Sequence, residues 1–365
     1  MGSNKFTIIH FQPLELYPPV VNFINCLQNH KDIDCTILST KWKYNLDIKY
    51  PCFRLGFVTK NKFVRIFNYF YFNLVGCIIL FVKRPQSIMY FETLSVFPAY
   101  VYKKVFVKTR VLVHFHEYTT LDEYSRSSRY YKYLHSCESK LLNSATVVSH
   151  TNEDRLKLYK SDFLDAINLN LFVLPNYPPS SWYKNFDLKR PSADIIQFVY
   201  VGSINLDSLH LDIFAKYIKG LQKLAVWNIY SNHYDNKVLQ YFKNLEADNI
   251  ILNNGIHYAD LPLTLSKYHV GVILYKGILP NHIYCVPNKL LEYYSCGLKV
   301  LCSSDLISSM KFIDNNKLKS VISIDFMDKD AVSNITEYLN DARSDLYKYE
   351  CDPVYESYIK SYITE

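Results

Sequence analysis

The chain has 365 residues, of which 49% are hydrophobic and 21% charged, a composition that excludes an intrinsically disordered protein and favours two folded domains over one. Only 9 glycines are present, which argues against a glycine-rich phosphate loop. The 9 cysteines show no CxxC spacing, which favours reduced thiols in the cytoplasm and gives no support for a metal site.

Positive charge gathers in the N-terminal half of the chain. No acidic residue lies between Ile48 and Phe91. The same stretch holds as many positive charges as the whole-chain net of +7, namely Lys49, Arg54, Lys60, Lys62, Arg65, Lys83 and Arg84. This asymmetry predicts an anionic partner for the N-terminal half, such as lipid headgroups, a pyrophosphate or nucleic acid.

Short apolar runs and helical periodicity alternate along this half of the chain. Residues 5–11 are predicted as a buried strand rather than a secretory signal, and residues 39–60 as an irregular basic segment. Further strands are expected at 34–38, 87–91, 110–115, 145–149 and 172–176, with helices at 20–27, 95–106, 122–142 and 150–159. This alternation favours a doubly wound α/β domain.

Residues 61–83 form a long apolar and aromatic stretch with three competing interpretations: a core helix, a membrane-facing helix and a transmembrane helix. The uninterrupted apolar part runs only from Ile66 to Val82 and contains Asn68 and Asn73, so a membrane span is marginal. The strand predicted directly after it favours a helix packed on a sheet, with part of its face left to lie against a bilayer.

Prolines and serines without any period mark a linker at residues 179–193, between a domain at 1–178 and a second αβ unit at 194–343. The second unit is predicted to have strands at 197–201, 225–230, 249–252, 270–274 and 321–324, and helices at 209–221, 236–245, 261–267 and 329–341. Residues 344–365 are expected to form a tail helix that packs back towards the N-terminal domain. Two such domains face a central cleft, and ligands bind at the carboxyl ends of their strands.

Residues 286–302 combine a helix with a following buried strand. Pro287 is expected at the first helical position, and Gly297 at the left-handed position that ends the helix. The helix start has free N–H groups and a positive dipole end, so it can hold a phosphate. The carboxylate of Glu292 can accept bonds from sugar or ribose hydroxyls, although this helix taken alone favours a solvated glutamate.

These residues resemble the nucleotide-sugar motif of glycosyltransferase family 4. Three further segments agree with that family in order and spacing: 173–176 at the linker entry, 200–202 at the start of the second domain, and 250–276 around the donor base. The positions matched within the motif are Pro287, Asn288, Lys289, Leu290, Glu292, Gly297 and Val300. The resemblance implies the α/β GT-B fold of two Rossmann-like doubly wound domains, with the donor bound mainly by the second.

The chain departs from the family pattern at three places. These are Tyr284 in place of the first motif glutamate, Ser203 and Ser208 in place of the Arg and Lys that neutralise the donor diphosphate, and Gln12-Pro13 in place of the first glycine loop. Lys276 and Lys289 are therefore expected as the replacement cations. The resemblance favours a retaining transfer, and the departures leave inversion open.

The resemblance also assigns donor-binding roles. Glu292 is expected to hold the ribose hydroxyls and Tyr258 to pack near the base. Asn281 and His282 are expected to contact the sugar. The remaining predicted donor-site residues are Gly202, Ser203, Lys276, Asn288, Lys289 and Leu290.

His116 and Glu117 end a predicted strand of the first domain, and in this fold they face the cleft. An imidazole or a carboxylate there can take the proton of the acceptor hydroxyl or orient the sugar. These two are the predicted catalytic residues, whereas His10, at the end of the first strand, is favoured as structural.

The sequence thus predicts a cytoplasmic glycosyltransferase, peripheral on the inner face of the cell membrane through its basic-aromatic residues 49–84. It would move a sugar from a UDP- or GDP-type donor to a hydroxyl of a glycan or lipid-linked acceptor, as in capsule or O-antigen synthesis, without a cofactor or metal. A nucleotide-sugar epimerase or hydrolase and a non-catalytic binding module stay open as alternatives. Nucleic-acid binding is disfavoured, because the basic residues are not interleaved with strand-borne aromatics.

Overall fold

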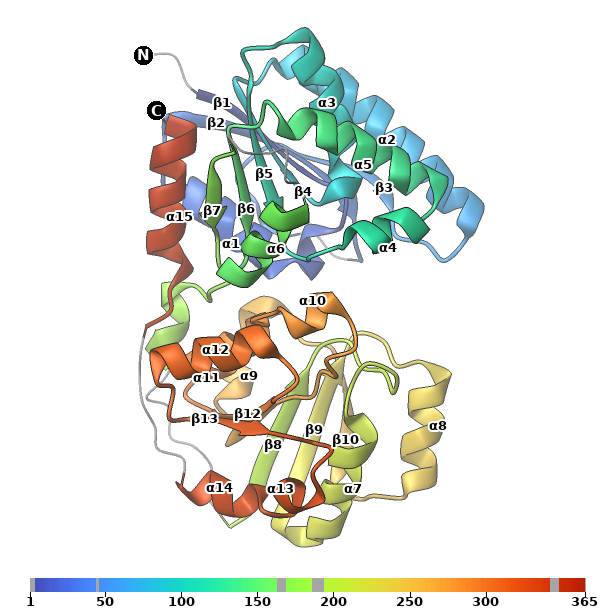
Figure 1. Ribbon diagram of the computed structural model, residues 1–365, viewed down its shortest axis with the longest axis vertical. Coiled ribbons are helices and arrows are strands. Elements are labelled where there is room, and N and C mark those ends of the chain that lie inside the picture. The colour runs from blue at the N-terminus through green and yellow to red at the C-terminus, as the bar shows by residue number, and fades with distance from the viewer. Residues whose placement is uncertain (1–3, 44–45, 163–168, 186–193, 342–347, 365) are drawn as a thin grey trace. The chain divides into compact units, whose positions relative to one another are not determined.

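The computed structural model describes residues 4–43, 46–162, 169–185, 194–341 and 348–364. The chain divides into two compact units, the first made of residues 1–176 and 351–365 and the second of residues 177–350. Each unit is a parallel β-sheet covered by helices on both faces (Figure 1). The predicted α/β class with two Rossmann-like doubly wound domains is confirmed.

The first unit contains a seven-stranded parallel sheet in the order β3-β2-β1-β4-β5-β6-β7. Its strands are β1 (Asn4–His10), β2 (Ile33–Lys41), β3 (Cys52–Phe57), β4 (Ser87–Phe91), β5 (Arg110–Phe115), β6 (Val147–His150) and β7 (Leu171–Val173). Its helices are α1 (Pro18–Leu27), α2 (Lys62–Lys83), α3 (Val96–Val105), α4 (Leu121–Arg126), α5 (Arg129–Leu142), α6 (Glu153–Asp162) and α15 (Cys351–Ile359). The central strands are almost continuously buried because both faces of the sheet are covered.

Alternate residues of these strands serve the two faces of the sheet. Ile9, Tyr90 and Val113 belong to the core that α2, α3 and α5 cover. On the other side of the sheet α1 packs against α15, with the rings of Phe23 and Tyr355 centred 5.4 Å apart. The C-terminal tail helix is therefore part of the first unit.

The second unit contains a six-stranded parallel sheet in the order β10-β9-β8-β11-β12-β13. Its strands are β8 (Ile196–Val201), β9 (Ala225–Ser231), β10 (Ile250–Asn254), β11 (Val270–Ile273), β12 (Lys299–Ser303) and β13 (Val321–Ile324). Its helices are α7 (Leu211–Leu221), α8 (Asn236–Leu245), α9 (Leu261–Leu265), α10 (Pro280–Ile283), α11 (Asn288–Ser295), α12 (Ile307–Asn316), α13 (Lys329–Ser333) and α14 (Ile335–Asp341). Helices α9, α11 and α12 cover one face, and α7, α8, α13 and α14 the other.

Four local predictions were wrong, one of them the single helix expected at 329–341, which is the two helices α13 and α14. The segment expected to be irregular contains the edge strand β3, which pairs with β2. The single helix expected at 122–142 is two helices, because Ser128 caps the start of α5 with its side chain and the chain is extended at Ser127. Pro287 is the N-cap of α11 rather than its first residue. Gly297 has a φ of 72°, the predicted left-handed conformation.

Gly271, in the middle of β11, lets α11 approach the sheet. A Cβ atom at this position would lie 2.2 Å from the ring of Tyr293, which is fully buried on α11. The Tyr293 hydroxyl accepts a hydrogen bond of 2.9 Å from the Val201 N–H at the end of β8. The glycine therefore fixes how closely α11 lies to the carboxyl ends of β8 and β11.

We expect Gly271→Ala to destabilise the second unit by roughly 1–3 kcal/mol, because the added methyl group overlaps the Tyr293 ring. Gly220→Ala is the matched control: it lies in α7, a Cβ there meets open space, and the change should stabilise by about 0.5–1 kcal/mol. Chemical denaturation of both variants measures the difference. Equal stabilities would show that α11 does not need the close approach.

Candidate functional site

In each sheet the order of the strands reverses beside the first strand of the unit. The chain winds from β1 outward to β2 and β3, then returns to place β4 on the other side of β1. The second unit does the same at β8 and β11. Ligands of open α/β sheets bind in the crevice outside the carboxyl ends of the strands at such a reversal. The topology alone therefore assigns one candidate site to each unit.

In the second unit this crevice is occupied by Lys289, from the first turn of α11. Its Nζ donates a hydrogen bond of 2.8 Å to the Tyr275 hydroxyl and lies 3.4 Å from the Tyr200 hydroxyl. The same atom lies 4.7 Å and 4.8 Å from the two ring centroids, so the ammonium group is held between two aromatic faces.

Gly202 makes room for this lysine. The residue follows β8 with a φ of 131°, which side chains rarely tolerate. A Cβ atom there would lie 2.8 Å from Lys289 Cε and 2.9 Å from its Nζ. The backbone conformation thus favours glycine at this position, and any larger residue would also push the end of the Lys289 side chain aside. Ser203 follows, and its carbonyl accepts a hydrogen bond of 2.5 Å from the Tyr200 hydroxyl.

The Lys289 side chain is half-buried. Burial acts to lower the pKa of its amine, whereas Tyr200 and Tyr275 act to raise it, and the net direction is upward. The hydrogen bond to the Tyr275 hydroxyl and the two ring contacts favour the ammonium form. A fixed cation at the carboxyl ends of β8 and β11 is suited to an anionic group such as a phosphate.

Glu292 lies one helical turn after Lys289, on the same side of α11. It is only 7% exposed, and burial raises the pKa of its carboxyl to about 7, opposed by the charge of Lys289. Among the residues that the structure describes, no hydrogen bond to its carboxyl oxygens is found, and these oxygens are not among the fully enclosed polar atoms that lack a partner. The carboxyl is therefore open to solvent and can accept hydrogen bonds from the hydroxyl groups of a ligand.

Of the other predicted donor residues, His282 contacts this site through Tyr275. The His282 ring stacks on Tyr275 with centroids 4.9 Å apart, and Asn281 precedes it in the short helix α10. Tyr258 packs against Trp182 at 4.9 Å in the core on the α11 side of the sheet. Asn288 is half-buried at the start of α11.

Leu290 does not reach the surface of the protein. Its side chain is completely buried, and its N–H donates to the Pro287 carbonyl at 3.0 Å. The structure thus places Leu290 in the core beneath the site, where it supports the helix rather than offering a group to a ligand.

Lys276 follows β11 at the edge of a cavity of about 520 Å³. Its Nζ donates to the Leu206 carbonyl at 3.0 Å. The same cavity is lined by His210 and Asp305, whose side chains form a hydrogen bond of 2.8 Å. Asp305 also accepts the Gly277 N–H at 3.2 Å. This pair, which no sequence pattern indicated, therefore fixes the loop that leads into α10.

The crevice of the first unit contains a smaller cavity of about 120 Å³, between the chain segments that follow β1 and β4. Phe11 donates its N–H to the Ser95 hydroxyl at 2.8 Å and so ties these two segments together. The cavity is lined by aromatic side chains and by several polar groups, among them His10, Gln12, Tyr17, Glu92, Glu117 and Tyr131.

Glu92 is the residue at this cavity that the sequence did not indicate. It follows β4 with φ 63° and ψ 154°, a conformation found almost only for glycine and costing on the order of 1–3 kcal/mol. Its carboxyl accepts the N–H groups of His116 at 2.6 Å and of Glu117 at 3.2 Å. Burial, and next the charge of Glu117, raise the pKa of this carboxyl to about 8. Strained, buried and pKa-shifted carboxyls cluster at functional sites.

His116, predicted to be catalytic, lies with its side chain buried near this cavity. Its ring is buried, stacked on Phe91 with centroids 5.4 Å apart and packed edge-on against His114 at 4.6 Å. Burial lowers the pKa of its imidazole to about 3, so the ring stays neutral at physiological pH. Glu117 is exposed and lines the cavity. The geometry therefore favours the carboxyls of Glu92 and Glu117 over the His116 imidazole for contact with a ligand.

His10 also lines this cavity, and its structural role stays a prediction. Its Nδ1 lies 2.9 Å from the Gln12 carbonyl, and its ring packs edge-on against Tyr17 at 4.5 Å. Burial lowers the pKa of its imidazole to about 3, with the nearby His116 contributing. Among the residues that the structure describes, no three His, Cys, Asp or Glu side chains are arranged to hold a metal ion.

No model of a protein family matches the sequence, and no curated protein matches it. Solved structures match along nearly the whole chain. A sucrose-phosphate synthase from Thermosynechococcus elongatus has 14% identity and a TM-score of 0.64, covering 99% of this chain and 95% of its own. A trehalose-6-phosphate protein from E. coli bound with UDP-2-fluoro glucose has 10% identity and a TM-score of 0.65, covering 99% of each chain. The lipopolysaccharide outer core galactosyltransferase WaaB has 13% identity and a TM-score of 0.60, covering 99% and 96%.

The chain has the GT-B fold. This confirms the fold that the resemblance of residues 286–302 to glycosyltransferase family 4 implied. At 9–14% identity these matches show that the fold is shared, and they do not assign a role to any residue. The roles of the predicted donor and catalytic residues stay predictions.

Glu92 generates a prediction about stability and pH. Because the folded state raises its pKa from about 4.5 to about 8, the folded protein keeps a proton that the unfolded chain releases, and stability falls as pH rises through this window. Glu92→Gln keeps an oxygen for the two N–H groups and removes the titration. We expect the melting temperature of the variant, relative to that of the wild type, to be higher at pH 8 than at pH 5.

Glu153→Gln is the control for loss of one carboxylate, since Glu153 forms only an exposed pair with Lys157 at 3.6 Å. Differential scanning calorimetry at the two pH values measures the effect. If the melting temperatures of Glu92→Gln and the wild type differ by the same amount at pH 5 and pH 8, the surroundings of Glu92 do not hold its carboxyl neutral.

Proposed function

We propose that the protein is a glycosyltransferase that moves a sugar from a nucleoside diphosphate sugar to a hydroxyl group. One observation carries this proposal: two tyrosines hold the half-buried Lys289 ammonium above Gly202, and the Glu292 carboxyl follows one turn later on the same helix. A cation for the diphosphate and a carboxyl for the ribose hydroxyls are what a nucleotide-sugar donor requires. Both groups stand at the strand reversal of the second unit.

The departing diphosphate carries the charge that develops during transfer. A cation fixed in advance, in surroundings from which water is largely excluded, stabilises that charge more than the same group in water. Tyr200 and Tyr275 fix the ammonium of the half-buried Lys289 in advance. The amide N–H groups at the start of α11 add to the positive potential.

We propose the cavity beside Glu92 and Glu117 as the acceptor side of the reaction. Its aromatic and carboxyl groups suit the C–H faces and hydroxyl groups of a sugar. The solved structures with this fold include a galactosyltransferase of the lipopolysaccharide outer core and a protein bound with UDP-2-fluoro glucose, which supports a sugar donor and a glycan acceptor. More specifically, we propose that the acceptor is a lipid-linked glycan, used at the inner membrane face in surface polysaccharide synthesis.

We expect UDP or GDP and their sugars to raise the melting temperature of the wild-type protein. Ligand at 100 times its dissociation constant stabilises by about 2.7 kcal/mol. Lys289→Met retains the volume between the two tyrosines and removes the charge, and should weaken nucleotide binding by about 1.5–3 kcal/mol, the range of a hydrogen bond to a charged group. Lys243→Met, on the exposed side of α8, is the control.

Thermal-shift titration followed by an assay for sugar transfer separates the alternatives. If no nucleotide raises the melting temperature, the result would contradict the proposal and favour a non-catalytic binding module. Stabilisation with conversion of the donor but no transfer to any glycan hydroxyl would favour an epimerase or hydrolase. Equal affinity in Lys289→Met and the wild type would remove Lys289 from the site.

A further inference from the structure

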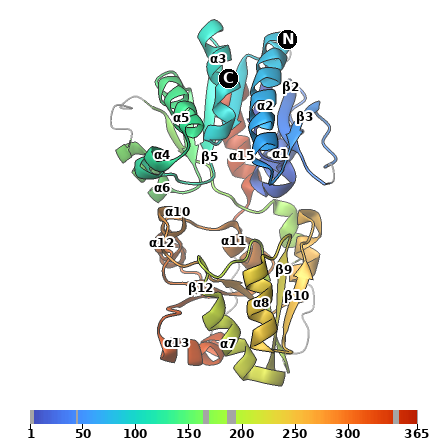
Figure 2. The same cartoon turned by 90° about the vertical axis from the view of Figure 1, so that its right-hand side faces the viewer.

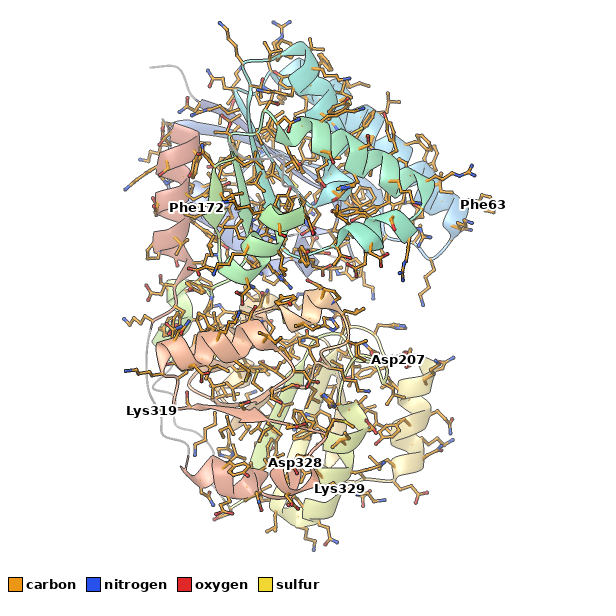
Figure 3. The ribbon with its side chains drawn as sticks, in the orientation of Figure 1. Phe63, Phe172, Asp207, Lys319, Asp328 and Lys329 are labelled. Atoms are coloured by element: carbon orange, nitrogen blue, oxygen red, sulfur yellow. The ribbon has the colours of Figure 1, made fainter. Side chains whose placement is uncertain are left out.

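The outer face of α2 is apolar and exposed. Between Arg65 and Lys83 every exposed side chain of this helix is apolar or aromatic. Phe63, at its start, is 81% exposed, and Figure 3 shows it at the outer end of the helix, pointing away from the sheet. The residues of this face, spaced three or four apart, are Phe63, Ile66, Phe67, Phe70, Tyr71, Leu74, Ile78, Phe81 and Val82. A surface helix normally turns polar residues to solvent, so this face is the reverse of the expected pattern.

The inner face of α2 is fastened to its own unit. Asn68 donates to the Phe57 carbonyl at 2.7 Å, and Asn73 donates to the Tyr130 hydroxyl at 2.5 Å. Phe72 and Leu80 are completely buried in the core that covers the sheet. By length and composition α2 is apolar enough to cross a membrane, with a mean hydropathy of 1.6. Crossing would require these inner contacts to break, so the helix can only lie along an apolar phase with its outer face.

The apolar surface continues beyond both ends of the helix. The ring centroids of Phe81 and Phe106 lie 5.8 Å apart. Val105 and Val107, which flank Phe106 in the chain, are exposed. At the other end Phe57 and Val58 are exposed next to the Asn68 contact. In Figure 2, α2 lies at the front of the first unit beside α3, consistent with one continuous face. Exposed apolar patches of this size mark interaction sites.

Basic residues bracket this surface. Lys60, Lys62 and Arg65 lie at the start of α2, Lys83 and Arg84 at its end, and all five are exposed. Lys104 and Lys108 flank the neighbouring valines and are also exposed. No acidic residue occurs between residues 48 and 91. Long basic side chains extend from an apolar surface to charged groups at its border, an arrangement suited to anionic headgroups around an apolar interior.

The charge distribution decides between a lipid surface and a second copy of the chain. A symmetric dimer places the same patch against itself, so the basic residues of one copy would face those of the other with no acidic residue of the segment to pair with them. An anionic lipid surface satisfies the apolar face and the basic border together.

We propose that the outer face of α2, with Phe57, Val58, Val105 and Val107, docks the protein on an anionic membrane surface, the helix lying in the plane of the interface. This deepens the proposed function, because it brings the first unit to where a lipid-linked acceptor would be presented. Docking itself requires neither nucleotide nor transfer.

The test is flotation of the full-length protein with vesicles of phosphatidylglycerol and phosphatidylcholine in equal parts, and with vesicles of phosphatidylcholine alone. We expect the wild type to float with the anionic vesicles only. Combined Phe67→Ser, Phe70→Ser and Leu74→Ser should reduce binding by more than about ten-fold, because each change removes apolar area that the lipid would bury. Leu239→Ser, Ile251→Ser and Leu263→Ser, exposed residues of the second unit, form the matched control.

Lys62→Gln, Lys83→Gln and Arg84→Gln should each weaken binding by roughly five-fold at low salt, with less effect at high salt. Light scattering without lipid should show a monomer. If the wild type is a dimer and the serine substitutions make it a monomer, a second copy of the chain is the partner and the proposal is overturned. Equal flotation of the α2 variant and the wild type would also overturn it. Thermal shifts with nucleotides on the same variants keep this result separate from the proposed function.

Discussion

The position of one ammonium group organises the second unit. Lys289 reaches back from α11 over Gly202, and two tyrosines from the ends of β8 and β11 hold its Nζ. This arrangement requires a helix packed close to the sheet, which Gly271 allows by leaving room for the Tyr293 ring. It also requires a glycine after β8, since any Cβ there would displace the lysine. The backbone, the core and the proposed chemistry of this unit therefore depend on the same contact.

Most of the α/β architecture could be predicted from the sequence, because buried parallel strands and covering helices leave strong periodic patterns. Residues 286–302 indicated a helix start, a left-handed end and a glutamate, and the structure has all three. What the pattern could not indicate is the surroundings of Lys289. Tyr200 and Tyr275 are 75 positions apart in the chain and meet only because β8 and β11 are neighbours in the sheet.

Glu92 escaped prediction for a related reason. In the sequence it is one acidic residue after a buried strand, and nothing marks its backbone as strained. The left-handed conformation, the two N–H groups of the β5 end and the like charge of Glu117 come together only in the folded unit. Conversely, the histidine that the sequence selected, His116, is enclosed by Phe91 and His114. The 61–83 stretch was ambiguous because periodicity places the apolar residues on a helix without saying which of them the sheet will cover.

The central claim is that Lys289 and Glu292 together bind a nucleoside diphosphate sugar at the strand reversal of the second unit. A crystal structure of the protein with a bound donor tests it most directly. The account predicts the diphosphate within hydrogen-bond distance of Lys289 Nζ, next to Gly202, and the ribose hydroxyls on the Glu292 carboxyl. A donor bound elsewhere, or a Glu292 carboxyl out of reach of the ribose, would contradict it.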